Sequence, residues 1–141
     1  MAPLPPNPVL RELEVFIGDW DVTVPGFPGG PGRATFEWLE GGAFLRFHSA
    51  APEPAPSATL IISRDDSGEA YTAFHYDSRG VSRVYGMGFD GRYWTFWRNA
   101  PGFQQRFEAL FADDTIDGTW EKAVDGGGWE HDLDFHYTRV R

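Results

Sequence analysis

Short runs of alternating apolar and polar residues fill most of the chain after residue 18, and turn sequences rich in Gly, Pro, Asn and Asp separate them. A period of two is typical of β-strands with one buried face. Short strands joined by tight turns favour an up-and-down antiparallel β-barrel, because closure removes exposed strand edges. We therefore predict an all-β, ten-stranded barrel with strands over residues 19–24, 33–40, 43–50, 57–63, 69–77, 80–89, 92–98, 103–111, 115–123 and 128–140.

The segment before these strands has a helical period instead. Its apolar residues Leu10, Leu13 and Phe16 share one helix face, and the preceding Pro suits a first helical turn. The pattern predicts a short helix over residues 8–17 that plugs one end of a barrel built from residues 18–141. At 141 residues, the whole chain (1–141) is expected to form a single domain.

Turn chemistry gives a first estimate of strand pairing. A two-residue turn at Asp90-Gly91 would place Arg83 opposite Arg98. Equivalent turns at Ser78-Arg79 and in "NAPG" extend the pairing to the flanking strands, and Gly41-Gly42 would set Trp38 opposite Leu45. The face expected inside then carries Phe74, Tyr76, Val81, Tyr85, Met87, Trp94, Phe96, Phe103, Phe107 and Phe111.

The last strand, "WEHDLDFHYTRV", alternates in the same way, with His131, Leu133 and Phe135 expected inside. His131 is then the only one of the four histidines predicted to face the interior, whereas His75 is expected outside. The inward polar residues gather near the end of the barrel that is opposite the helix: Tyr76, Arg83, Arg98, Gln105, Lys122 and His131. No inward Asp or Glu is expected beside them.

The arrangement resembles the calycin superfamily of lipocalins, fatty-acid-binding proteins and nitrobindins. In that superfamily a Trp near the start of the barrel is covered by an Arg from the last strand, which implies a structural contact between Trp20 and Arg139. The chain is also similar to a bacterial family of small calycin-like proteins of unknown function. That resemblance is carried by "FIGDWDV", "FEWLEGGAFL", "YDSRGVSRVY", "QRFEALF" and "WEHDLDFHYTRV".

Composition narrows the classes of function. Aromatic residues make up 16% of the chain, too much apolar surface for a disordered protein. The formal net charge of −9 argues against a nucleic-acid partner, since phosphate binding needs a basic surface. No apolar run is long enough for a spanning helix and no secretory signal is recognised, so we expect a cytoplasmic protein without a membrane partner. Without Cys there is no disulfide framework.

Two unneutralised arginines facing a partly desolvated cavity are costly unless an anion meets them. The sequence therefore predicts binding of a small apolar or aromatic, anionic molecule by a monomer or homodimer. The expected ligand-binding residues are Arg83, Arg98, Tyr76, Tyr85, Trp38, Trp94, Phe96, Gln105 and His131. In an alternative interpretation, the arginines stay hydrated at the rim or pair with Asp77 or Glu53.

His131 leaves the chemistry open. It can be a neutral core histidine, or it can act in an isomerase, cyclase or hydratase as a general acid or base beside Tyr85 or Tyr76. The nitrobindin resemblance adds a third option, in which His131 is a haem ligand, although the glycine-rich motif of that group is replaced here by "GDWDVTV". No cofactor is otherwise expected, and no metal site is predicted, because no second inward His or carboxylate falls near His131.

Overall fold

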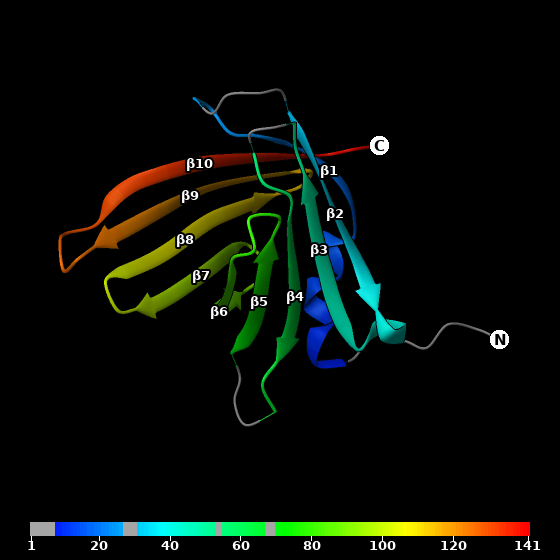
Figure 1. Ribbon diagram of the computed structural model, residues 1–141. Coiled ribbons are helices and arrows are strands. Elements are labelled where there is room, and N and C mark those ends of the chain that lie inside the picture. Colours follow the sequence, from blue (N-terminus) through cyan, green and yellow to red (C-terminus); the bar gives the residue numbers. More distant parts are fainter. Residues whose placement is uncertain (1–7, 27–30, 53–54, 67–69) are drawn as a thin grey trace.

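The computed structural model describes residues 8–26, 31–52, 55–66 and 70–141, which form a closed all-β barrel (Figure 1). The ten predicted strands are confirmed and pair antiparallel in chain order, and β1 pairs with β10 to close the barrel. They are β1 Gly18–Thr23, β2 Gly32–Leu39, β3 Phe44–Ala50, β4 Ala58–Arg64, β5 Tyr71–Asp77, β6 Ser82–Phe89, β7 Tyr93–Ala100, β8 Phe103–Ala112, β9 Thr115–Val124 and β10 Glu130–Arg139. Two short 3-10 helices accompany them, η1 over Pro8–Phe16 and η2 over Glu40–Gly42.

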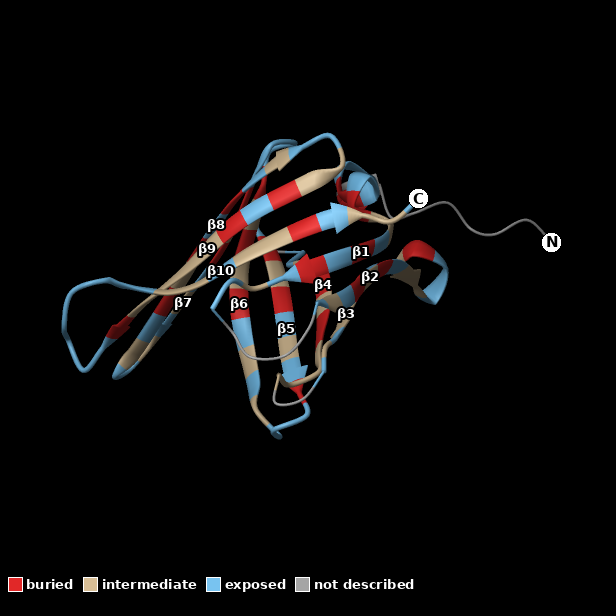
Figure 2. Ribbon diagram, turned by 90° about the horizontal axis from the view of Figure 1, so that it is seen from above, coloured by how far each residue is buried: buried red, intermediate tan, exposed pale blue. Residues whose placement is uncertain are grey.

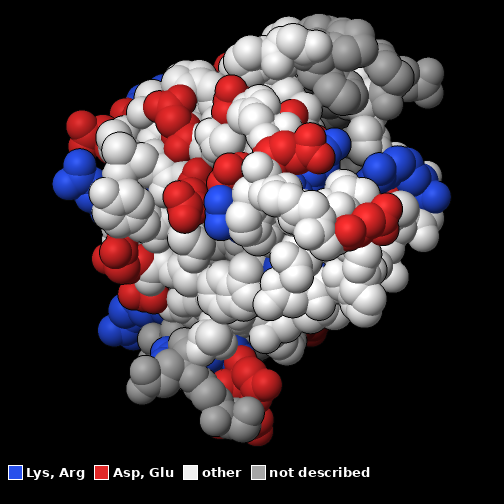
Figure 3. Space-filling view, turned by 90° about the vertical axis from the view of Figure 1, so that its left-hand side faces the viewer, with Lys and Arg blue, Asp and Glu red and all other residues white. Residues whose placement is uncertain are grey.

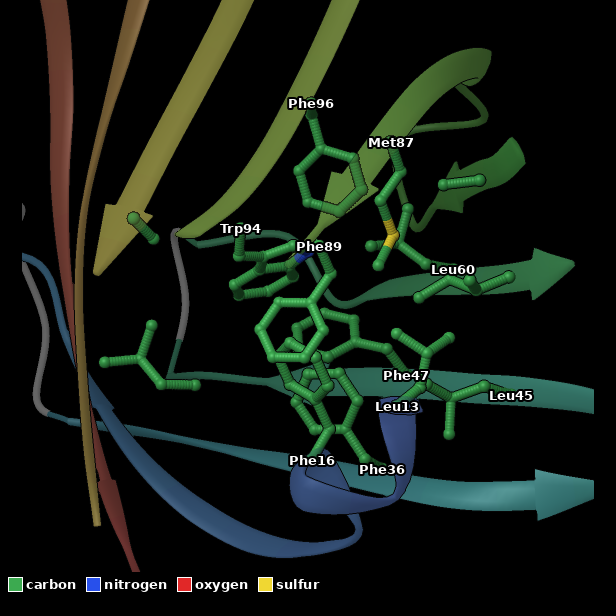
Figure 4. Close-up of a cluster of buried hydrophobic side chains, with 14 of the residues drawn as sticks. Leu13, Phe16, Phe36, Leu45, Phe47, Leu60, Met87, Phe89, Trp94 and Phe96 are labelled. Carbon is green, nitrogen blue, oxygen red and sulfur yellow. The ribbon is translucent and has the colours of Figure 1, made fainter. Parts of the chain in front are cut away.

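Helix η1 closes one end of the barrel, as predicted. Leu10, Leu13 and Phe16 are completely buried. The Phe16 ring lies 4.9 Å from the ring of Trp94 and 5.0 Å from that of Phe36, on the helix side of the cluster in Figure 4. No helix in the described part of the chain is both long and apolar enough to cross a membrane.

The Trp20–Arg139 contact secures this closed end. The two residues are partners in the β1–β10 ladder, and the guanidinium carbon of Arg139 lies 4.2 Å from the centre of the Trp20 ring. The same guanidinium donates to the backbone carbonyls of Ile17 at 2.9 Å and Val15 at 2.6 Å. The end of η1 is therefore bonded to the seam where the first and last strands meet.

The first half of the barrel has the predicted register. Trp38 lies opposite Leu45, and Glu37 forms an exposed ion pair with Arg46 at 2.7 Å. Buried and exposed residues alternate along the strands (Figure 2). This alternation places the core inside the barrel, as the period of two predicted.

The ladder between β6 and β7 is much shorter than either strand. In the described structure these strands pair only over residues 86–89 and 94–97, next to the closed end. Beyond these pairs the strands diverge, and β7 to β10 extend away from β5 and β6 in both views (Figures 1 and 2). The barrel is therefore open at its other end between residues 82–85 of β6 and residues 98–100 of β7.

Candidate functional site

The predicted inner face of β6, β7 and β8 is confirmed, although the pairing differs. Phe89 lies opposite Trp94 instead of Arg92, because the turn contains four residues and the Asp90 carboxylate accepts from the backbone N–H groups of Arg92 and Tyr93. A shift of two residues keeps every side chain on its predicted face. It does, however, separate the two arginines along the ladder, so the prediction that Arg83 lies opposite Arg98 is wrong.

The predicted face of β5 is wrong. Tyr76 lies opposite Ser82 instead of Val81, because the turn holds one more residue and the Asp77 carboxylate accepts from the backbone N–H of Arg79. A shift of one residue exchanges the two faces of a strand. Tyr76 therefore lies on the outer wall, 45% exposed, as does Phe74, while His75 and Asp77 face inward.

The predicted inward position of His131 is also wrong. A β-bulge between His131 and Leu133 makes Asp132 an extra residue, so His131 pairs with Glu121 of the outer face. Its side chain is 60% exposed and lies 3.1 Å from the Asp134 carboxylate. His131 therefore cannot ligate a haem inside the barrel or act on a molecule bound there. Leu133 and the residues that follow keep their predicted faces.

The divergence of β6 and β7 creates a groove of about 620 Å³ at the open end. Both predicted arginines, Arg83 and Arg98, contribute to its lining. Apolar side chains form the rest of the wall, chiefly Phe74, Val84 and Trp97 from the outer face. The structure thus brings the two arginines together in one groove although they are not ladder partners.

Gln105 connects the inward polar groups Arg83 and Tyr85. It lies opposite Arg98 and is buried, and its Oε1 accepts from the Tyr85 hydroxyl at 3.1 Å and from Arg83 Nη1 at 3.4 Å. Arg83 also lies over the Phe103 ring, with 5.5 Å from the guanidinium carbon to the ring centre. Because Oε1 already accepts two bonds, the remaining hydrogen-bonding groups here are mostly donors.

The charges around the groove are unequally paired. Within the described residues, neither Arg83 nor Arg98 forms an ion pair. Lys122 differs, because its Nζ lies 3.6 Å from the Asp132 carboxylate. The alternative pairing with Asp77 is wrong, since that carboxylate is bonded to Arg79; Glu53 lies outside the described residues.

The prediction that no inward Asp or Glu would be found is wrong. Asp77 faces inward, and its side chain is only 1% exposed. Asp77 accepts from Arg79 Nη2 at 2.7 Å, Arg79 Nε at 3.2 Å and His75 Nε2 at 2.9 Å. The hydrogen bonds from Arg79 hold the pKa of the Asp77 carboxyl far below its usual range, with a further contribution from His75 that together outweighs the cost of burial.

The aromatic residues predicted to contact a ligand lie in different parts of the barrel. Trp94 is buried in the core against Phe16, and Trp38 lies at the closed end, two residues beyond the Phe36 that pairs with Gly18. Tyr85 and Phe96 are adjacent, with ring centres 5.8 Å apart, and lie beneath the open end. None of these four lines the groove, whereas Tyr76 on the outer wall lies beside it, since it pairs with the lining residue Ser82 and its ring centre is 5.9 Å from that of Phe74.

Trp97 is a groove residue that the sequence analysis missed. Its indole lies directly on Gly86, where an added Cβ would come within 2.2 Å of Trp97 Cε2. Figure 3 shows the side of the barrel where the hairpins β7–β8 and β9–β10 end, with charged side chains around a largely uncharged middle. A glycine that lies across the sheet from an outward-facing aromatic residue is the sequence signal that would have indicated the apolar wall of this groove.

Together, the fold and the site define a closed ten-stranded antiparallel barrel with an arginine-lined groove at its open end. No protein-family model matches the chain, and no curated protein matches it. Among solved structures it is similar to the crystal structure of Rv2717c from M. tuberculosis, with a TM-score of 0.67 and 15% sequence identity. The match covers 97% of this chain and 100% of that one. This likeness concerns the fold alone.

Proposed function

We propose that this calycin-like barrel binds a small apolar or aromatic molecule that carries an anionic group, at the groove between β6 and β7. The observation that carries the proposal is that Arg83 and Arg98 line one groove and neither has an ion-pair partner among the described residues. The sequence predicted such a ligand inside the barrel. The groove at the open end is the site that we propose for it.

The lining suits both parts of such a ligand. Phe74, Val84 and Trp97 provide apolar contacts, and each of them is substantially exposed in the free protein. The guanidinium groups present several N–H donors in a fixed plane, a geometry that matches carboxylate, sulfonate or phosphate oxygens. Apolar walls with a few convergent polar groups are typical of small-molecule sites.

The location of the arginines also indicates how strong the binding should be. Both are partly buried and partly open to water, so each gains less from an anion than a fully buried group would. A charge-assisted hydrogen bond contributes about 1.5–3 kcal/mol. Loss of one such bond corresponds to roughly a tenfold change in Kd. Because the groove is open, salt should weaken the binding.

Two fluorescent probes of similar shape test the proposal. Anilinonaphthalene sulfonate is an aromatic anion, and N-phenylnaphthylamine is its neutral counterpart. We expect Arg83→Met/Arg98→Met to raise the Kd for the anion at least about tenfold. The Kd for the neutral probe should change less than about twofold, since the apolar wall remains and Met preserves much of the aliphatic packing.

The matched control is Arg33→Met, which removes an exposed arginine from the outer wall, where it pairs with Asp21. It should leave the Kd values of both probes unchanged. If the double variant binds the anion as tightly as the wild type while its circular dichroism is unaltered, the arginines do not hold the anionic group and the proposed function is wrong.

A further inference from the structure

His75 and Asp77 form a buried pair immediately inside the open end. Both face inward, because the turn after β5 holds one residue more than a two-residue hairpin. Asp77 is almost completely enclosed, whereas 17% of the His75 side chain remains exposed. The imidazole therefore lies between an enclosed carboxylate and the space at the mouth of the barrel.

The hydrogen bonds assign the tautomer of His75. An ionised carboxylate can only accept, so Nε2 carries the proton that Asp77 Oδ2 accepts at 2.9 Å. Arg79 keeps Asp77 ionised and in place through its backbone N–H and its side chain. Nδ1 is then the basic nitrogen, and no group in the described part of the chain donates to it.

The surroundings of His75 can be named for each neighbouring strand. On β4 its ladder partner is Leu60, which is apolar. On β6 its partner is Arg83, and the Tyr85 ring lies edge-on with its centre 6.0 Å from that of the imidazole. The charged groups around it are therefore Asp77, Arg79, which bonds the same Asp77 oxygen, and its ladder partner Arg83, which also lines the groove.

We propose that His75 is a general base that removes a proton from a molecule bound at the mouth of the barrel. In this step Nδ1 accepts the proton, Asp77 stabilises the resulting imidazolium, and Arg83 and Tyr85 stabilise the negative charge left on the bound molecule. Return of the proton to another atom of the same molecule makes the overall reaction an isomerisation. The inference rests on the proposed anion-binding function for access and charge stabilisation.

Nitrobenzisoxazole is a suitable probe, because a single base converts it. The base removes the proton on the ring carbon next to nitrogen, the C–H electron pair forms a nitrile, and the N–O bond breaks with its electron pair on oxygen. The product is a cyanonitrophenolate, an aromatic anion that absorbs visible light. We expect the wild-type chain to exceed an equal concentration of free imidazole by at least about tenfold in rate.

His75→Ala and the more conservative His75→Gln should each lower kcat at least about tenfold with KM nearly unchanged. The matched control is His136→Ala, because His136 also pairs with a carboxylate, Asp117, but lies on the outer wall. It should keep the wild-type rate. Circular dichroism and anilinonaphthalene sulfonate binding check that each variant is folded.

Two results would overturn the proposal: a wild-type rate no greater than that of imidazole, or a rate that survives both His75 substitutions. If His75 variants lose no rate but Arg83→Met/Arg98→Met still loses the anion, only the base is wrong. If the double variant keeps the anion while His75 controls the rate, only the binding proposal is wrong. The two experiments therefore fail independently.

Discussion

Replacement of Asp77 by Asn removes the negative charge of the most enclosed ion-paired carboxylate among the described residues. With Oδ1 facing the Arg79 backbone N–H, the new amide nitrogen faces the N–H groups of His75 and Arg79, so donors meet donors. The Arg79 side chain is half exposed and regains water, so we discount its contribution. The lost bond from His75 to a charged acceptor leaves a destabilisation of about 2 kcal/mol.

The pH dependence has a definite sign. Because the pKa of Asp77 in the folded protein lies far below its ordinary value of 3.8, the unfolded chain takes up the proton first. The stabilisation is therefore fully present above that value and is lost as the pH falls below it. The Asn variant lacks this contribution, so its stability difference from the wild type should narrow as the pH falls below about 4.

Urea unfolding followed by tryptophan fluorescence measures this difference at each pH. At neutral pH the midpoint should fall by roughly 1 M, given typical urea dependences for a domain of this size. Asp21→Asn, which alters only an exposed pair with Arg33, should leave the midpoint close to that of the wild type. A difference between Asp77→Asn and wild type that is the same at about pH 3 as at pH 7 would refute the reasoning.

Two further predictions concern the closed end and the groove. Arg139→Met should lower the melting temperature by about 5–10 °C, since it loses the contact with Trp20 and two bonds to η1 carbonyls; a loss no larger than that of Arg33→Met in calorimetry would contradict this. Gly86→Ala should displace the indole of Trp97 and cost about 1 kcal/mol. The emission of Trp97 is the difference between the spectrum of Gly86→Ala and that of the same variant with Trp97→Phe. We expect this emission to lie at longer wavelength than the corresponding difference between the wild type and Trp97→Phe. An unchanged wavelength would show that the ring has not moved.

The number of strands, their order and the plug could be predicted because their signals are local. Alternation with a period of two identifies a strand without knowledge of its partner. The Trp20–Arg139 contact followed from the calycin resemblance, and the even number of strands agreed with it. Burial of Leu13 and Phe16 followed from a helical period that ends where the first strand begins.

The site was predicted only in part because it depends on the parity of the turns. The turns on either side of β7 each differ by two residues from the prediction, so Arg83, Arg98 and Gln105 stayed on the inner face. The turn after β5 differs by one residue, which moved Tyr76 outward and His75 inward. The length of a hairpin loop with several polar residues is decided by side-chain bonds such as the one that Asp77 accepts from the Arg79 backbone N–H, which alternation cannot indicate.

The bulge in β10 could not be found from periodicity for a related reason. The apolar residues after Asp132 alternate in phase with Trp129 before it, so the sequence pattern continues through the extra residue. An acidic residue inserted between two residues that pair with the neighbouring strand gives no local sequence signal of a bulge. Its pairing with Lys122 across the sheet is a tertiary contact that only the assembled barrel defines.

The most direct test of the arginine-lined groove is a map of amide chemical-shift changes when anilinonaphthalene sulfonate is titrated into the labelled full chain. We expect the largest changes in residues 82–86 of β6 and residues 97–100 of β7, together with the side-chain Nε signals of Arg83 and Arg98. Changes centred instead on η1 and the closed end, with both arginine signals unmoved, would contradict an anion site between the diverging strands.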